Sequence, residues 1–188
     1  MFYDVLEKIM DSKDTTVGGG SASAVAGAMA AGLVGMVARL STGKQYGLPD
    51  ERYLGIADEL DMLAVKLKDG AIADTQSYLG IKAAFLLPKS TEAEKAVRRA
   101  AVEEAAIMAA KVPLENGRAA LRILELCKEM EGKFNTAASS DMEAGIMLAK
   151  MAVVDTALNV EANLSLIKTP VINQELAAAA LVLKNSAK

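Results

Sequence analysis

The 188-residue chain is long enough for one domain with a sizeable core, and its net charge of −3 without a basic cluster argues against a nucleic-acid partner. It contains no histidine, which excludes the usual zinc sites and every histidine-dependent catalytic triad. Hydrophobic residues make up 52% of the chain but aromatic residues only 4%, which favours close-packed helices over a β-sandwich. The single cysteine, Cys127, cannot form an intramolecular disulfide, so we expect a cytoplasmic protein.

A short amphipathic helix is predicted first, because apolar residues recur at helical spacing between residues 2 and 10. A polar linker then leads to residues 17–38, which carry no charge and begin with the turn Gly18, Gly19, Gly20 and Ser21. A glycine-rich turn before a helix exposes backbone amides and is a natural anion site. The alternative is a flexible turn with no ligand.

The same uncharged stretch is long enough to cross a bilayer. Its residues are mostly alanine and glycine, which insert weakly into membranes, so we favour no membrane partner. Small residues recur at four-residue spacing along it, including Gly20, Ala24, Ala28 and Gly32, and such stripes let another backbone approach closely. The pattern predicts a buried central helix or an oligomer interface.

The rest of the chain also has the pattern of helices. One is predicted to be capped by Asp50 and to run to about Phe85. A capping box at Thr91 opens the next helix. Pro113 predicts a break before a further helix. A long helix that a capping box at Ser140 opens and a last helix capped by Asn173 complete one all-α domain over residues 1–188, an antiparallel bundle built around the buried Ala/Gly-rich helix.

Polar residues stand out at two places in the pattern of these predicted helices. Asp74 stands on an apolar stripe with Leu67 and Ile81, so its carboxylate points either into the core, where burial would suit it to proton transfer, or into solvent. For a lone acid the solvent position is the commoner one. Asp155, Asn159 and Asn163 share one face of the long helix, and that pattern alone is typical of a solvated stripe.

Six short motifs occur in one order along the chain. They are Gly18-Gly19-Gly20-Ser21, Asp74-x-x-x-Tyr78, Leu87-Pro88-Lys89, Val112-Pro113-Leu114, Ser140-Asp141 and Asn159-Val160-x-x-Asn163-Leu164. In this order they resemble the cyclodeaminase/cyclohydrolase family, which includes the C-terminal half of formiminotransferase-cyclodeaminase and stand-alone methenyltetrahydrofolate cyclohydrolases. The resemblance covers nearly the whole chain, without the formiminotransferase half. Val17 and Tyr78 depart from the family's usual proline and phenylalanine.

The resemblance implies a site for a folate near the glycine turn and a homodimer. It makes Asp74 the catalytic residue, which reverses the solvent interpretation of this side chain. The substrate-binding residues that it implies are Gly18, Gly19, Gly20, Ser21, Lys89, Arg98, Asn135, Ser140, Asp141, Asn159 and Asn163. Lys89 and Arg98 are candidates for the glutamate tail of the folate.

The implied reaction needs no prosthetic group, because a tetrahydrofolate derivative is itself the substrate. The cyclodeaminase reaction closes a ring on 5-formiminotetrahydrofolate and releases ammonia, whereas the cyclohydrolase reaction opens the methenyl ring with water. Sequence does not separate the two, and we narrowly favour the cyclodeaminase. The alternative from another class is a non-catalytic helical assembly protein that uses its small-residue stripe only to associate.

Overall fold

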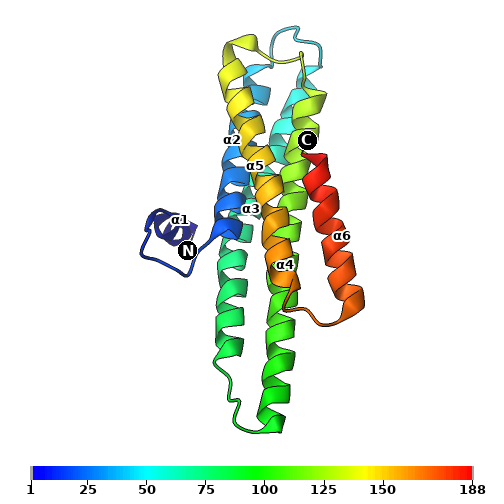
Figure 1. Cartoon of the computed structure of the whole chain (residues 1–188). Coiled ribbons are helices and arrows are strands. Elements are labelled where there is room, and N and C mark those ends of the chain that lie inside the picture. Colours follow the sequence, from blue (N-terminus) through cyan, green and yellow to red (C-terminus); the bar gives the residue numbers. More distant parts are fainter. Residues whose placement is uncertain (1, 188) are drawn as a thin grey trace.

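The computed structural model describes residues 2–187 and shows an antiparallel helical bundle (Figure 1). This part of the chain contains no β-strand, which confirms the predicted fold class. The helices are α1 (Phe2–Met10), α2 (Gly19–Leu40), α3 (Asp50–Phe85), α4 (Glu92–Glu129), the short 3₁₀ helix η1 (Thr136–Ala138), α5 (Ser139–Leu164) and α6 (Pro170–Ser186).

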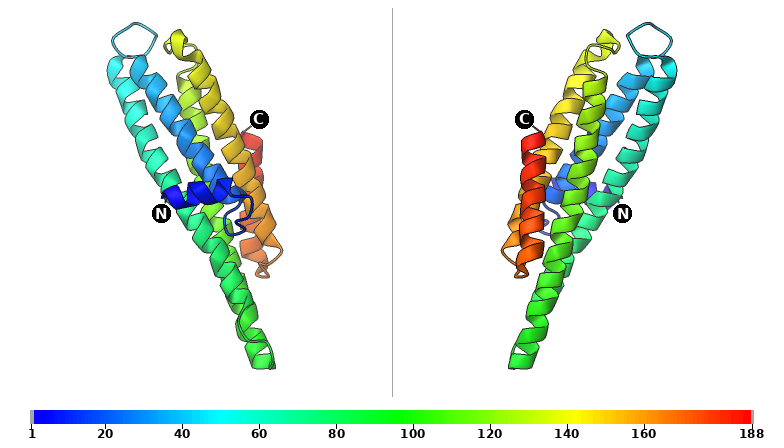
Figure 2. Two further views of the ribbon diagram at one scale, coloured as in Figure 1. Left: turned by 90° about the vertical axis from the view of Figure 1, so that its left-hand side faces the viewer. Right: turned by 90° about the vertical axis from the view of Figure 1, so that its right-hand side faces the viewer.

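Helices α2, α3, α4 and α5 form the bundle, and consecutive helices run in opposite directions (Figure 1). α2 packs most extensively against α3 and α5, while α6 covers one side of α4 and α5. α1 lies across the bundle near the start of α2, and the hairpin of α3 and α4 projects beyond the other helices (Figure 2). The first turn of α2 therefore lies partway along the bundle, beside the middle of α3.

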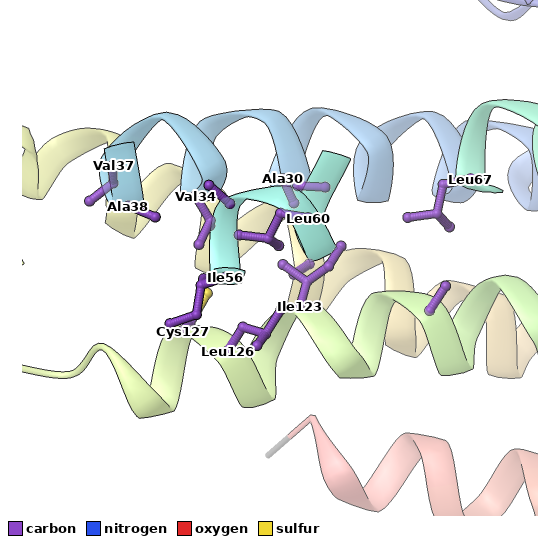
Figure 3. Close-up of a cluster of buried hydrophobic side chains, with 14 of the residues drawn as sticks. Ala30, Val34, Val37, Ala38, Ile56, Leu60, Leu67, Ile123, Leu126 and Cys127 are labelled. Atoms are coloured by element: carbon purple, nitrogen blue, oxygen red, sulfur yellow. The ribbon is translucent and has the colours of Figure 1, made fainter. Parts of the chain in front are cut away.

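The main core lies where α2 meets α3 and α4 (Figure 3). Ala30, Val34 and Val37 of α2 are fully buried there against Leu60 of α3 and Ile123 of α4. The helices approach closely because α2 is built from small residues. At Gly27, for example, a β-carbon would lie 3.0 Å from Leu67 Cδ1, which is tighter than ordinary van der Waals contact. The predicted central helix is thus confirmed.

In the described part of the chain, α2 is also the one helix that is long and apolar enough to cross a membrane. Within its most apolar window, 67% of the residues are buried inside the bundle, which is what a core helix requires. The exposed part of α2 that remains carries the apolar residues Met29, Gly32, Met36 and Leu40, and Arg39 at its end. Apolar residues exposed along one helix face indicate a surface that another molecule can cover.

The break predicted at Pro113 is wrong, because α4 continues through it as one helix. Proline has no backbone N–H and therefore leaves the carbonyl of Ala109 without its helical donor. The Asn163 side chain of α5 supplies one instead, with Nδ2 3.2 Å from the Ala109 oxygen. Packing of α4 against α3 and α5 on both sides of the proline holds the two halves in line.

Three of the four predicted helix caps, those at Asp50, Ser140 and Asn173, are wrong. Asp50 is the first residue of α3, and the residue before it, Pro49, caps without a side-chain hydrogen bond. The capping box at Thr91 is confirmed, with reciprocal hydrogen bonds between Thr91 and Glu94. α5, however, begins at Ser139 without a side-chain cap, one residue before the predicted Ser140. Asn173 lies inside α6 and donates to the carbonyl oxygens of Leu164 and Ile167, so it closes the end of α5 instead of opening α6.

Candidate active site

A cavity of about 330 Å³ opens beside the first turn of α2. Four segments meet there: the linker before α2, the middle of α3, one turn of α4 and the C-terminal half of α5. Its volume is at the lower end of the range for small-molecule sites. The lining residues are Thr15, Thr16, Val17, Gly18, Gly20, Asp74, Ser77, Tyr78, Ile81, Ala109, Asn159, Ala162 and Asn163.

Asp74 of α3 closes the N-terminus of α2. Its Oδ2 accepts a hydrogen bond of 2.8 Å from Ser21 Oγ, and the carboxylate also accepts the backbone N–H of Ser21. Thr75 Oγ1 lies 3.0 Å from the same Ser21 hydroxyl. Gly18, the N-cap residue of α2, has no side chain to offer, so a carboxylate from another helix takes over part of the capping role.

Gly20 is the residue that lets Asp74 approach. A β-carbon at this position would lie 2.7 Å from Asp74 Cγ, a distance that real β-carbons essentially never show. A β-carbon on Gly18, by contrast, would meet nothing within 4 Å. The consecutive glycines therefore have different roles: Gly20 makes room for the carboxylate, while Gly18 forms part of the open cavity wall.

A second carboxylate, Asp155 of α5, lies on the other side of the same helix start. Its Oδ2 accepts a hydrogen bond from the hydroxyl of Ser23, which also lies 2.7 Å from the carbonyl oxygen of Gly19. A β-carbon on Gly19 would lie 3.1 Å from Asp155 Oδ2. Gly19 thus makes room for Asp155 as Gly20 does for Asp74.

Asn159 and Asn163 continue from Asp155 along α5 and line the cavity. Asn159 Nδ2 donates to the backbone oxygen of Asp155 at 2.8 Å and to its Oδ2 at 3.1 Å. Asn163 Nδ2 donates to the backbone oxygen of Asn159 at 2.9 Å. The predicted polar face of α5 is therefore a hydrogen-bonded wall of the cavity, and its interpretation as a solvated stripe is wrong.

The pKa of Asp74 is raised above its ordinary value. Burial is the largest cause, because a partly buried carboxylate loses the hydration that stabilises its charge, and the nearby Asp155 charge adds to it. The hydrogen bonds from Ser21 act in the opposite direction but do not cancel the effect of burial. A carboxyl group with this environment, at the wall of a cavity, is suited to accept and return a proton.

The inward position of Asp74 and its association with Gly18, Gly20, Ser21, Asn159 and Asn163 in one place agree with the predicted site. Lys89 and Arg98 lie elsewhere. Lys89 is exposed in the loop after α3. The Arg98 guanidinium donates to the carbonyl oxygen of Phe85, about 16 Å along α3 from Asp74. Their contact with a folate stays a prediction.

Asn135, Ser140 and Asp141 lie at the opposite end of the bundle. Asn135 Nδ2 donates to the carbonyl oxygen of Leu40, and its backbone N–H donates to Ser41 Oγ, at the C-terminal end of α2. α2 has 22 residues, so this end is about 30 Å from the glycine turn. Within one chain these three residues do not reach the cavity, and their substrate-binding role also stays a prediction.

Three site residues are absent from the sequence-based set: Asp155, Ser23 and Thr75. Asp155 carries a usable signal, because it shares a helix face with the two asparagines. Ser23 and Thr75 carry none, since a serine or threonine inside a helix usually bonds only its own backbone. Their contacts with Asp155 and Ser21 cross between helices, so only the packing of the bundle defines them.

The fold and the cavity define a class of protein: an all-helical bundle with a partly buried aspartate over a glycine-rich helix start. Residues 3–181 match the family described as formiminotransferase-cyclodeaminase. The chain belongs to this family.

Individual relatives agree with the family match. The chain is 32% identical over 170 residues to the methenyltetrahydrofolate cyclohydrolase of Methylorubrum extorquens, covering 85% of this chain and 79% of the relative. It is 27% identical to the formimidoyltransferase-cyclodeaminase of Gallus gallus over 84% of this chain, which spans 29% of that protein. Formiminotetrahydrofolate cyclodeaminase from Thermotoga maritima shares the fold, with a TM-score of 0.81, 23% identity and coverage of 94% of this chain and 84% of that one.

Gly20 and Gly18 form a matched pair for testing the close approach of Asp74. We expect Gly20→Ala to lower the free energy of unfolding by about 1–3 kcal/mol, because the new methyl group overlaps the carboxylate. Gly18→Ala should change it by less than about 1 kcal/mol, because the space there is open. Urea unfolding of both variants measures the difference, and equal stabilities would show that the carboxylate does not need the glycine.

The raised pKa of Asp74 also predicts how stability changes with pH. The stabilisation associated with the protonated form is fully present below the unfolded-state pKa and is lost as the pH rises through the raised folded-state pKa. Asp74→Asn cannot ionise, so its free energy of unfolding should improve relative to wild type as the pH rises from below the unfolded-state pKa through the raised folded-state pKa of Asp74. Asp69→Asn, at an exposed position of α3, serves as the control and should show no such trend.

Proposed function

We propose that the chain is a folate one-carbon enzyme that acts on 5,10-methenyltetrahydrofolate, opening its ring with water to give 10-formyltetrahydrofolate. The observation that carries the proposal is a carboxylate with a raised pKa in a cavity whose described lining includes no lysine or arginine. The reacting carbon of the methenyl compound belongs to a cation. A single carboxylate beside this carbon would attract the cation and could also accept a proton from the attacking water.

The proposed hydrolysis needs one proton-transfer group. Water attacks the methenyl carbon, and Asp74 accepts a proton from it as the C–O bond forms. When the bond between this carbon and N5 breaks, the protonated carboxyl returns its proton to N5, and the remaining hydroxyl proton is released to solvent as the formyl C=O forms. Ser21 keeps Asp74 in place throughout, because its hydroxyl and backbone N–H both donate to the carboxylate. The polar contacts of the site thus hold the base while leaving one side of it open to the cavity.

Cyclodeamination is the second candidate, which the sequence narrowly favours. In that reaction N10 attacks the formimino carbon, and Asp74 would carry the proton from N10 to the departing ammonia. The similarity to the Gallus gallus relative supports it, but the cyclohydrolase relative matches over most of both chains and at higher identity. One assay separates the two: the absorption of the methenyl compound falls during hydrolysis and rises when it is made from the formimino compound.

Replacing the proposed base tests the mechanism. Asp74→Asn keeps the size of the side chain and an oxygen that can accept from Ser21, but it cannot accept a proton. We expect the fold and folate binding to be retained while turnover falls about 10²–10⁴-fold. In wild type, kcat/KM should also decrease as the pH falls through the raised pKa of Asp74, and the variant should lack this decrease.

A circular-dichroism melt must accompany these kinetics. Near-normal turnover by a folded Asp74→Asn variant would make Asp74 a structural residue and would refute the assignment. Failure of the wild-type protein to convert either the methenyl or the formimino compound would instead leave the non-catalytic assembly protein as the better explanation.

We also propose that the protein is a homodimer that buries the exposed face of α2. Met29, Met36 and Leu40 are 50%, 40% and 50% exposed on this face. The charge between them, Arg39, pairs with Asp58 and Asp61 of α3. Gly32 lies between the two methionines, and a β-carbon at this position would meet no atom within 4 Å, so a partner helix could approach closely there.

The dimer is tested by placing a charge on this face. Wild type should sediment as a dimer at micromolar concentration, and Met36→Glu should shift it towards monomer, because an unpaired carboxylate would be buried in the interface. Met62→Glu is the matched control on α3, where the methionine is 67% exposed. A wild-type protein that sediments as a monomer would exclude the dimer.

A further inference from the structure

The side chains of α5 that line the cavity have free hydrogen-bond acceptors, whereas their donor groups are already bonded to the protein. Asn159 and Asn163 both line the cavity, and both use their NH₂ groups on protein oxygens. Because every one of those partners is a carbonyl or a carboxylate, the amide nitrogen has to face the protein. Each side-chain oxygen is therefore turned away from these partners.

Each asparagine is held in this orientation by different hydrogen-bond partners. For Asn159 it is Asp155, whose backbone oxygen and carboxylate both accept from Nδ2, and Ser23 in turn fixes that carboxylate. For Asn163 it is the carbonyl of Ala109, which is available because Pro113 cannot donate to it. The proline inside α4 thus helps to set the orientation of the Asn163 amide at the cavity wall.

Two hydroxyl groups at the cavity are also already bonded to the protein, so free acceptors outnumber free donors among these side chains. Within residues 2–187, no protein donor bonds to Asn159 Oδ1 or Asn163 Oδ1. The Thr16 hydroxyl donates to Asp14, and the Ser77 hydroxyl donates to the backbone oxygen of Asp74, so neither points a free hydrogen at a ligand. Besides the hydroxyls of Thr15 and Tyr78, which can donate or accept, the described lining carries three side-chain acceptors: Asn159 Oδ1, Asn163 Oδ1 and the Asp74 carboxylate. A ligand that pairs with these three must bring N–H or O–H donors.

We infer that Asn159 and Asn163 select the substrate by accepting N–H hydrogen bonds from the 2-amino-4-oxopyrimidine ring of the pterin, and that Asp155 is a positioning residue for this recognition. The inference rests on the proposed function and adds to it which end of the folate these side chains contact. That ring has adjacent N–H donors at N3 and at the 2-amino group. Selectivity of this kind is strong, because a ligand without the donor leaves a buried acceptor unpaired.

The test compares two ligands on the same protein: tetrahydrofolate and its analogue with the 2-amino group replaced by methyl. Dissociation constants are measured by calorimetry. Wild type should bind tetrahydrofolate about 5- to 150-fold more tightly than the analogue, the range expected for one lost hydrogen bond to a buried group. Equal binding of the two ligands by wild type would overturn the inference without any variant being needed.

Variants then assign the discrimination to side chains. The double variant Asn159→Leu/Asn163→Leu should bind the two ligands with nearly equal affinity, whereas Tyr78→Phe, which changes another lining residue, should keep the wild-type ratio. Asp155→Asn should lower the ratio although Asp155 does not line the cavity, because its new NH₂ group can accommodate a flipped Asn159. If the folded double variant keeps the wild-type ratio of the two dissociation constants, the role of the asparagines is refuted. If Asp155→Asn keeps that ratio, the positioning role of Asp155 is refuted.

The outcome also separates this inference from the proposed function. A wild-type protein that hydrolyses methenyltetrahydrofolate without discriminating between the two ligands keeps the function and refutes the recognition. A wild-type protein that binds neither ligand refutes both.

Discussion

The site depends on the contact between the Asp74 carboxylate and the first turn of α2. This contact gives a helix without a side-chain cap an acceptor for its free N–H groups, and it holds a carboxylate that burial makes harder to ionise. The contact exists only because position 20 is glycine. Helix capping and the proposed proton-transfer chemistry therefore use the same atoms, so a change that improves one affects the other.

The two carboxylates at this helix start differ in what surrounds them. Asp74 lines the cavity, whereas Asp155 lies behind it and receives hydrogen bonds from Ser23 and Asn159. The helix N-terminus is favourable for negative charge, which helps both acids to lie near one another. The glycine turn by itself suggests an anion site for a ligand. In the folded protein the chain's own carboxylates occupy that position, and the ligand's part of the cavity is left to a cationic or donor-bearing group.

Pro113 and Asn163 show how a local irregularity becomes part of a site. A proline in the interior of a helix leaves a carbonyl unpaired, and such a group is costly when it is buried. Asn163 removes that cost from a neighbouring helix and becomes fixed in return. The same exchange occurs at the end of α5, where Asn173 donates to two free carbonyl oxygens. In both places an asparagine side chain satisfies a backbone group outside its own helix.

The sequence by itself determined the all-α class, the central Ala/Gly-rich helix, the uninterrupted helix from Asp50 to Phe85 and, through the family resemblance, the candidacy of Asp74. These features depend on local periodicity, small-residue content and short motifs, which are written along the chain. Only the tertiary structure decided that α4 runs through Pro113, that Asp155, Ser23 and Thr75 join the site, and that Asn135 lies at the far end of the bundle. The reason is physical: these outcomes depend on which helix faces meet and on the hydrogen bonds exchanged between them, and no spacing within one helix encodes that choice.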